Sequence, residues 1–563
     1  MNNLSLCVVI VGTFFTTMGD VRAADNSSAR GTQGMVATVN PYATDAAVAV
    51  MRDGGNAIDG AIAAALMLGV VDGHNSGIGG GCFMVLRLAD ATLVAIDGRE
   101  TAPLGASRDM YVREGQAQPE LSKTGALAVG TPGALAAYAY AVQHYGKRNL
   151  PELLAPAAAT AEKGFPLDRV YASRLRSERK HLARFAGSRQ MLLKADGHPY
   201  QAGDVLRLHD LAETYRAIAE HGVEWFYEGP FANKVETWMR DNDGVLTSDD
   251  FRNYEVKRRE PVRSTYRGYQ VVGFPPPGSG GVHVAQILNI LENFQLGDTS
   301  PDDRTHLVAE AMKQAFADRA YWLGDPDFAK VPRGLIDKQY ARQQAKRIQL
   351  STAAKIPGHG TPPAWQTDVF GKHTTHIAAA DAAGNWVAIT TTLNTAFGSK
   401  VVVPGTGVVL NNQMDDFSSQ PGVPNAFGLV GAEANSIAPG KRPLSSMSPT
   451  IVLKDDQPVL TLGAAGGPRI ISQVVLTIVH HIDGGMSLGD AVAAARFHHQ
   501  WSPDRLFVEA NLDEAIIKNM RQRGHQIQLM PYVGVTQAIG LDGDERGFVG
   551  VHDPRVPGKA AGY

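Results

Sequence analysis

The chain has 563 residues, 44% of them hydrophobic, and its 53 basic and 56 acidic residues leave a formal net charge of −3. This length and apolar content suffice for a large packed core and suggest more than one domain. The balanced charge gives no electrostatic basis for binding nucleic acid or a membrane surface.

Residues 1–23 have the pattern of an export signal. An apolar stretch from Leu4 to Phe15 precedes Val21-Arg22-Ala23, which is a small-x-small cleavage sequence. The stretch is too short to span a bilayer, and no later segment is long and apolar enough. The absence of Lys or Arg before it leaves a buried N-terminal strand as the alternative. The signal predicts a periplasmic or secreted protein.

The two cysteines are not expected to form a disulfide. Removal of the signal would take away Cys7 and leave Cys82 without a partner in the chain. An exported protein without disulfides depends on its core for stability. Cys82 lies in GIGGGCFMVL, where we expect a small buried hydrophobic side chain rather than a reactive thiol.

The first part of the chain predicts helices around a few strands. Residues 44–71 are rich in Ala and helical in pattern, with a break at Gly54-Gly55. The sequence GIGGGCFMVLRL passes from a glycine turn into a strand, and TLVAIDGRE forms another strand that reaches Arg99. A dinucleotide loop needs a strand before its glycines and a helix after them, so this reversed order argues against that cofactor. Helices dominate residues 126–220, including a basic run, 176–184, that we interpret as a solvent-exposed helix face.

The pattern changes in the second part of the chain. A strand, a Pro/Gly turn and an amphipathic helix are predicted within residues 266–294, and a further helix at 305–322. Residues 351–373 lack helical or strand periodicity and read as a long loop. Hairpins follow at 374–392 and 448–467, then the helix PRIISQVVLTIVHHI and the strands RLFVEA and GFVGVHD. Helices flanking paired hairpins predict stacked sheets covered by helices.

The hairpin at 374–392 has a register that can be derived from its turn. In DAAGN the third loop residue, Gly384, is the one that takes a left-handed conformation. Pairing centred on Ala383 then places Thr374 opposite Thr392, with Cβ atoms roughly 5 Å apart on one face. Facing threonines are also common in ordinary strands, so this pairing alone does not define a site.

The histidines of the chain do not form a metal-binding pattern. His373 and His376 are three residues apart, so in a strand they point to opposite faces. The adjacent histidines at 480–481 and at 498–499 likewise point in different directions and do not converge on one ion. We therefore predict no metal site.

Several longer motifs resemble those of γ-glutamyltransferases, also called glutathione hydrolases. TTH, TLNTAFGS, LNNQMDDFS, GKRPLSSMSPTIV and AAGGPRII are similar to motifs of the small subunit. NAIDGAIAAAL, SGIGGGCFM, DGRETAP, GTPGALAAY and PPPGSGGVH are similar to motifs of the large subunit. The resemblance keeps the family order and covers nearly the whole chain after the signal.

The resemblance implies an α+β fold, the four-layer αββα sandwich of N-terminal-nucleophile hydrolases. It implies that the precursor cuts itself between His373 and Thr374. Residues 24–373 would form a large subunit and 374–563 a small one, held together as a heterodimer. Thr374 would be the nucleophile, and its new α-amino group, which titrates near 7.7–8.0 in peptides, would be the base. No cofactor is implied.

The resemblance also assigns the remaining site residues. Thr392 would orient the nucleophile, and the backbone N–H groups of Gly466 and Gly467 would bind the oxyanion. A simple strand-to-helix turn is the alternative for these glycines, because N–H groups are unpaired there in any case. The α-carboxylate of a γ-glutamyl head would bind to Arg99, Ser445 and Ser446, and its α-amino group to Asn394, Gln413 and Asp416.

The implied substrates are glutathione and other γ-glutamyl compounds, with water, amino acids or dipeptides as acceptors. In place of a lid tyrosine found in some bacterial relatives, this chain has Phe427, which cannot hydrogen-bond to Asn394. This departure leaves a glutaryl-cephalosporin-type acylase as one alternative, although a glutaryl group has no amine to pair with Asp416. A catalytically inactive exported binding protein is the other; the retained Thr374 and glycine pair argue against it.

Overall fold

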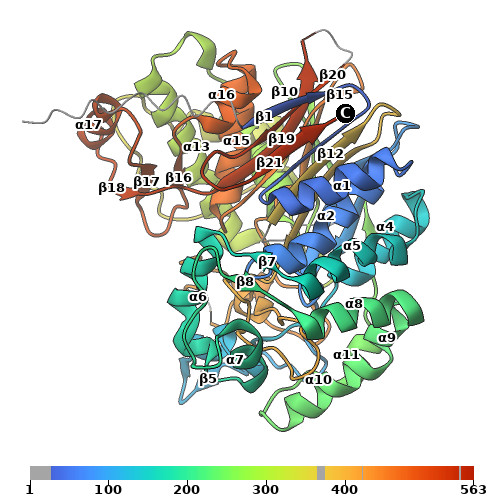
Figure 1. Ribbon diagram of the computed structural model, residues 1–563. Helices are drawn as coiled ribbons and strands as arrows, with labels where there is room; N and C mark the ends of the chain where they lie inside the picture. The colour runs from blue at the N-terminus through green and yellow to red at the C-terminus, as the bar shows by residue number, and fades with distance from the viewer. Residues whose placement is uncertain (1–26, 364–374, 421, 544–546) are drawn as a thin grey trace, which may run out of the picture.

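Two large antiparallel sheets lie face to face, with helices on both outer sides (Figure 1). The structure, a computed structural model, describes residues 27–363, 375–420, 422–543 and 547–563. Helix, sheet, sheet and helix form four layers, which confirms the predicted α+β, αββα sandwich. Each sheet has seven strands.

The first sheet combines strands from the two ends and the middle of the chain. In spatial order it contains β1 (Ser28–Gly31), β20 (Gly547–His552), β19 (Val535–Asp542), β15 (Gln457–Ala465), β14 (Thr450–Lys454), β11 (Tyr269–Gly273) and β10 (Val262–Tyr266). The second sheet contains β21 (Lys559–Gly562), β2 (Gly34–Thr38), β12 (Thr375–Asp381), β13 (Trp386–Thr392), β3 (Gly81–Arg87), β4 (Leu93–Gly98) and β9 (Lys257–Arg259).

The space between the sheets is filled by side chains from both. Phe83 of β3 and Phe274, just after β11, stack with ring centroids 3.9 Å apart. Along β12, Ala378 and Ala380 face this inner core, whereas Ile377 and Ala379 face the helices. Because β12 is buried on both faces, its sequence shows no alternation of apolar and polar residues.

Helix α2 (Ala57–Val71) packs on the outer face of the second sheet together with α1 (Pro41–Arg52). Nearly all its residues are buried, which explains why it is apolar on every side. Asn56 and Asp59 form a reciprocal capping box at its start. The break between α1 and α2 agrees with the predicted one at Gly54-Gly55.

Further helices extend from the second sheet in the lower half of Figure 1. They are α3 (Pro119–Lys123), α4 (Ala134–Tyr145), α5 (Leu150–Lys163), α6 (Arg169–Leu182), α7 (Ala186–Leu192), α8 (His209–His221), α9 (Glu224–Tyr227), α10 (Pro230–Arg240) and α11 (Ser248–Arg252). The basic residues of α6 are exposed, as expected. Short ladders join β5 (Val112–Arg113) to β6 (Gln116–Ala117) and β7 (Phe165–Pro166) to β8 (Val205–Leu206).

The outer face of the first sheet is covered by another set of helices. These are α12 (Ser279–Leu291), α13 (Pro301–Trp322), α14 (Lys338–Ala345), α15 (Arg469–Ile482) and α16 (Leu488–Ala493). Beside them lie α17 (Glu514–Gln522) and a small sheet of β16 (Phe497–His499), β17 (Leu506–Glu509) and β18 (Ile527–Met530). Within the described residues, no helix is long and apolar enough to cross a membrane.

The predicted hairpin register is confirmed over the described residues. Thr375 pairs with Thr391 and Ala380 with Trp386, so the ladder is centred on Ala383. Gly384 has φ of 96°, the left-handed conformation that the turn requires. The opposing pair predicted one step further contains Thr374, which lies outside the described residues.

Two sequence predictions are refined by the structure. The single strand expected near residue 266 is a hairpin, β10–β11, because Arg267 and Gly268 form a turn with φ of 51° and 80°. Cys82 is fully buried in β3, and burial raises the pKa of its thiol, as expected for a structural side chain.

Candidate active site

The site predicted from the sequence lies where the start of β12 and the end of β13 approach β15. His376 faces the first sheet, and its ring packs against Gly463 of β15, where an added Cβ would lie 2.4 Å from His376 Nδ1. That Nδ1 is 3.0 Å from the hydroxyl of Thr390. Burial lowers the pKa of His376 to about 3, so the ring is neutral. His373 and Thr374 lie outside the described residues.

Thr392 closes β13 and is 1% exposed. It lies opposite Gly81 of β3, and its Oγ1 accepts a hydrogen bond from the Asn394 N–H at 2.7 Å. Gly80 packs against it so closely that a Cβ there would lie 1.8 Å from the Thr392 carbonyl oxygen. This contact explains one glycine of the SGIGGGCFM motif by steric exclusion.

Gly466 and Gly467 form the turn between β15 and α15. Their φ angles of 136° and 65° are conformations that L-amino acids with side chains rarely adopt. Among the described residues, no acceptor is found for the backbone N–H of either glycine. Two unpaired donors at this turn are the arrangement that an oxyanion site needs.

Arg99 is fully buried just after β4, and each of its three guanidinium nitrogens donates a hydrogen bond. Nη2 donates to Asp416 at 2.7 Å, Nη1 to Glu100 at 3.2 Å and Nε to the Pro443 carbonyl at 3.1 Å. The sequence prediction placed Arg99 and Asp416 at opposite ends of a substrate, but here they contact each other directly. Buried charges pair in this way because isolation would be costly.

Two charged residues near this pair were missed from the sequence. Burial raises the pKa of Glu100 to about 7, despite the opposing charge of Arg99. Arg319 of α13 donates through Nε to Ser279 at 3.2 Å, and burial lowers its pKa to about 9 while Asp416 opposes this shift. Glu100 could have been found from its position beside Arg99, whereas nothing local marks Arg319.

The remaining predicted binding residues lie around this cluster, and all are buried except Asn394, which is half-buried. Asn394 has φ of 82°, donates through Nδ2 to the Asn412 carbonyl at 2.9 Å, and its Oδ1 has no partner among the described residues. The Ser446 hydroxyl is likewise buried without such a partner. Gln413 begins the short turn Gln413–Asp416, and Ser445 contacts Ser279 through its carbonyl oxygen. Buried polar atoms without partners are uncommon and mark a place where a polar ligand fits.

The loop after Asp416 contacts the carboxylates of Asp415 and Asp416 in a way that the sequence did not predict. Asn425 Nδ2 lies 3.4 Å from Asp416 Oδ1, and the Ala426 N–H donates to Asp415 at 2.9 Å. Phe427 instead packs against the apolar core of the first sheet, and its carbonyl accepts from Gln500 at 3.3 Å. Asn425 and Asn435 of this loop thus both contact Asp416, through its carboxylate and its backbone carbonyl respectively.

Asp72 anchors the start of β12 from the opposite face. Its Oδ2 accepts from the Thr375 hydroxyl at 3.1 Å and its Oδ1 from Asn75 at 3.0 Å. Burial raises the pKa of Asp72 to about 7, and it lowers that of the neighbouring His74 to about 3. Sequence reasoning missed this contact because 303 residues separate Asp72 from Thr375.

One buried group of described residues has metal-ligand chemistry, although no metal pattern was found in the sequence. His306 and Glu310 of α13 meet His525 from the loop after α17. His306 Nδ1 lies 2.8 Å from His525 Nε2, and Lys313 Nζ lies 2.8 Å from the Glu310 carboxylate. Since Lys313 already supplies a cation to Glu310, we interpret the group as a buried polar network between α13 and the C-terminal region.

Comparison with known proteins agrees with this geometry. Residues 43–563 match the family described as Gamma-glutamyltranspeptidase. A glutathione hydrolase proenzyme of Escherichia coli is 42% identical over 95% of this chain and 92% of its own length. The acylase ACY 1 proenzyme of a Pseudomonas species is 37% identical over 92% of each chain. The crystal structure of a cephalosporin acylase from Bacillus halodurans, 30% identical, superposes with a TM-score of 0.85 over 95% of this chain and 97% of its own.

The stacked sheets and the site at the start of β12 thus define an enzyme of the N-terminal-nucleophile hydrolase class. Within that class, the chain belongs to the γ-glutamyltranspeptidase family. The resemblance drawn from its motifs is confirmed.

Proposed function

We propose that the protein is a precursor that cuts itself between His373 and Thr374 and then hydrolyses the γ-glutamyl amide bond of glutathione. The observation that carries this proposal is the buried pair of Arg99 and Asp416, at the same end of the second sheet as the start of β12. It offers one charge of each sign to a zwitterionic γ-glutamyl head. The glutathione hydrolase proenzyme of Escherichia coli, 42% identical, supports the same substrate.

The proposed reaction proceeds through an ester on Thr374. Its hydroxyl attacks the γ-carbonyl carbon while the α-amino group takes the proton, and the N–H groups of Gly466 and Gly467 stabilise the oxyanion. The C–N bond then breaks, and the leaving amine receives the proton. Water, an amino acid or a dipeptide attacks the ester and releases glutamate or a new γ-glutamyl compound.

Substrate binding on this proposal rearranges the charged pair. The α-carboxylate would take over the Nη2 position of Arg99 that Asp416 now holds at 2.7 Å, with Ser445 and Ser446 beside it. Asp416 would then turn to the α-amino group, assisted by Asn394 and Gln413. The unpartnered Oδ1 of Asn394 and hydroxyl of Ser446 support these positions.

The proposal includes an exported, two-piece enzyme. Residues 1–23 would be removed as a signal, and residues 24–373 and 374–563 would remain together in the periplasm or outside the cell. Both sheets contain strands from both pieces, which supports a heterodimer that stays assembled after cleavage.

A glutaryl-cephalosporin-type acylase is the second candidate. It is favoured by the TM-score of 0.85 to the Bacillus halodurans acylase and by the 37% identity to ACY 1. Asp416 argues for γ-glutamyl substrates, because a glutaryl group lacks the amine that this carboxylate would bind.

One set of assays separates these functions. A denaturing gel with two bands supports an active enzyme, whereas one full-length band supports an inactive binding protein. Rates on a γ-glutamyl anilide, with and without a dipeptide acceptor, are then compared with rates on the matching glutaryl anilide. Faster cleavage of the glutaryl compound would contradict the proposed function.

A further inference from the structure

A cavity lies at the far end of the β12–β13 hairpin from the site described above. Its volume is about 780 Å³, and it opens where the hairpin turn meets the β14–β15 turn and the ends of β19 and β20. Since β12 has seven residues, this cavity is about 20 Å from the first of them. Its volume is in the range of small-molecule sites.

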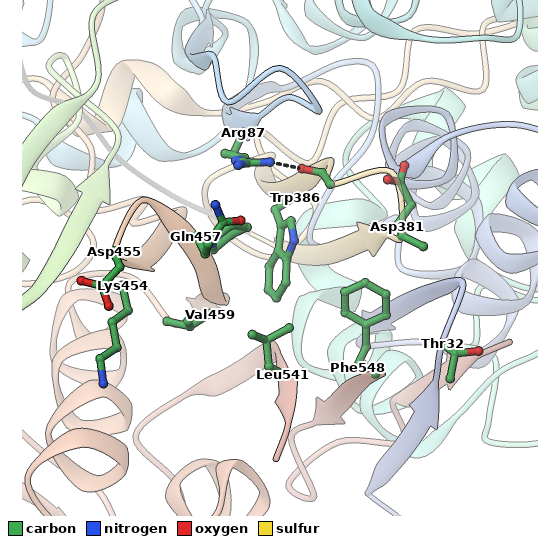
Figure 2. Close-up of a pocket in the computed structure, with 14 residues that line it drawn as sticks. Thr32, Arg87, Asp381, Trp386, Lys454, Asp455, Gln457, Val459, Leu541 and Phe548 are labelled. Carbon is green, nitrogen blue, oxygen red and sulfur yellow. Dashed lines mark hydrogen bonds between the residues drawn. The ribbon is translucent and has the colours of Figure 1, made fainter. Parts of the chain in front are cut away.

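The floor of the cavity is apolar and aromatic. Trp386 is 2% exposed and meets the ring of Phe548 edge-on, with centroids 5.7 Å apart. Figure 2 shows the indole at the centre of the lining, with Leu541 and Phe548 on one side of it and Arg87 on the other. No described residue accepts a hydrogen bond from the indole N–H. This floor fits a flat aromatic or short aliphatic group.

Arg87 forms a charged wall above this floor. It pairs across the sheet with Trp386, which places both side chains on the same face. Its Nη1 donates to the Gly384 carbonyl at 2.9 Å (Figure 2). Its Nε is buried without a partner among the described residues, and Arg87 forms no ion pair with any of them. The residue itself is only 7% exposed.

Asp381, one of the two acidic residues that line the cavity with Asp455, does not form an ion pair with Arg87. Asp381 accepts hydrogen bonds from the backbone and side chain of Asn385 and from the Ala57 N–H at 2.8 Å. Buried arginines are normally paired with carboxylates, because an isolated charge is poorly solvated inside a protein. A guanidinium fork that forms no ion pair with a described residue, beside an aromatic floor, is complementary to a carboxylate that carries an apolar group.

We propose that this cavity is a second binding site, specific for small carboxylates with an aromatic or aliphatic body. The carboxylate pairs with Arg87, and the body packs on Trp386 between Leu541 and Phe548. The site is separate from the γ-glutamyl site and does not depend on the function proposed above.

Isothermal titration of the full-length purified protein with 4-phenylbutyrate and its neutral analogue 4-phenylbutanamide tests this proposal. We expect the acid to bind at least tenfold more tightly than the amide. Arg87→Gln should reduce the affinity for the acid to that for the amide, whereas the exposed Arg113→Gln should change neither. Leu541→Trp leaves Arg87 in place but fills the cavity, so it should abolish binding of both compounds.

The controls distinguish this site from the γ-glutamyl site and from misfolding. Saturating 4-phenylbutyrate should leave the KM for a γ-glutamyl anilide unchanged, and each variant must unfold within a few degrees of the parent. If Arg87→Gln does not fold, the Leu541→Trp variant and the comparison of acid with amide still test whether the cavity binds carboxylates. Equal binding of acid and amide, acid binding retained in Leu541→Trp, or no detectable heat with the acid would overturn the proposal.

Discussion

Individual hydroxyls and charges decide what the site can do. Thr392 Oγ1 accepts the Asn394 N–H at 2.7 Å, which leaves its own proton free to donate. The confirmed register predicts that this donor faces Thr374. Such a bond would orient the nucleophile, and small misplacements of reacting atoms reduce rates by large factors.

Replacing Thr392 by Val keeps the shape of the side chain and removes the hydroxyl. We expect Thr392→Val to fold, to cut itself at least tenfold more slowly and to turn over substrate poorly after maturation, because both reactions use the oriented oxygen. Thr392→Ser should retain much of both activities. A time course of band intensities on a denaturing gel, followed by turnover measurements, checks this. A Val variant that matures like the parent would show that the hydroxyl has no role.

Replacing Arg99 by Lys keeps a positive charge but loses the fork that contacts Asp416, Glu100 and the Pro443 carbonyl. We expect a KM for γ-glutamyl substrates raised by about tenfold or more, since Lys cannot reproduce the planar fork of donors. Self-cleavage should proceed at the parental rate. An unchanged KM would place Arg99 outside the substrate site.

At the scale of elements, the site is assembled by loops that hold the start of β12 and the end of β13. Asp72, just after α2, binds the Thr375 hydroxyl from one face. Gly80, just before β3, supports the Thr392 carbonyl by close backbone packing. Both residues lie in the segment 72–80, so one loop fixes both strands of the hairpin.

The raised pKa of Asp72 makes stability depend on pH. Its folded pKa of about 7 exceeds the ordinary value of 3.8, so the ionised form is disfavoured in the fold. This penalty is absent below pH 3.8, grows as pH rises towards 7 and is constant above that. Asp72→Asn should therefore gain stability relative to the parent between pH 4 and pH 7, by up to about 4 kcal/mol. Melting temperatures at pH 5 and pH 8 test the sign; a larger gain at pH 5 would contradict it.

Gly80→Ala tests the close packing against β13. A Cβ would lie 1.8 Å from the Thr392 carbonyl oxygen, so β3 or β13 must move apart. We expect the variant to remain largely uncleaved and to be destabilised by about 2 kcal/mol or more. The matched control is Gly358→Ala, because nothing lies within 4 Å of a Cβ there. Normal maturation of Gly80→Ala would show that this contact is not needed.

The local sequence pattern predicted most helices and strands, but it did not predict contacts between residues that are far apart in the sequence. Gly384 alone fixed the register of β12 and β13, because a three-residue turn permits few arrangements. The main helices and the hairpins β12–β13 and β14–β15 were predicted from periodicity and turn residues, whereas the hairpin β10–β11 was expected as a single strand. The Arg99–Asp416 contact, Arg319 and the Asp72–Thr375 bond were not predicted, since each joins segments whose approach depends on packing of the whole sandwich.

At the scale of the whole molecule, neither half of the sequence contains all the strands of either seven-stranded sheet. In the first sheet, β20, β19, β15 and β14 of the C-terminal part lie between β1 and β11 of the N-terminal part. In the second sheet, β12 and β13 lie between β2 and β3. The two pieces therefore depend on each other for their strand neighbours.

This interleaving predicts that the mature protein behaves as one folded unit. We expect two bands on a denaturing gel but a single species by size exclusion and one cooperative thermal transition. Sequencing should find the small piece starting at Thr374, and Thr374→Ala should remain one chain. Dissociation of the pieces under native conditions, or a small piece with another first residue, would contradict this account.

The pairing of β12 is compatible with the chain break proposed before Thr374. Its ladder with β13 begins at Thr375, but its ladder with β2 begins only at Ala378. The first residues of β12 therefore lie at an open edge, although the strand is central further along. Cleavage of the chain before Thr375 would break no hydrogen-bonded pair between β12 and β2. A new N-terminus could therefore form in the middle of the sheet without loss of strand pairing.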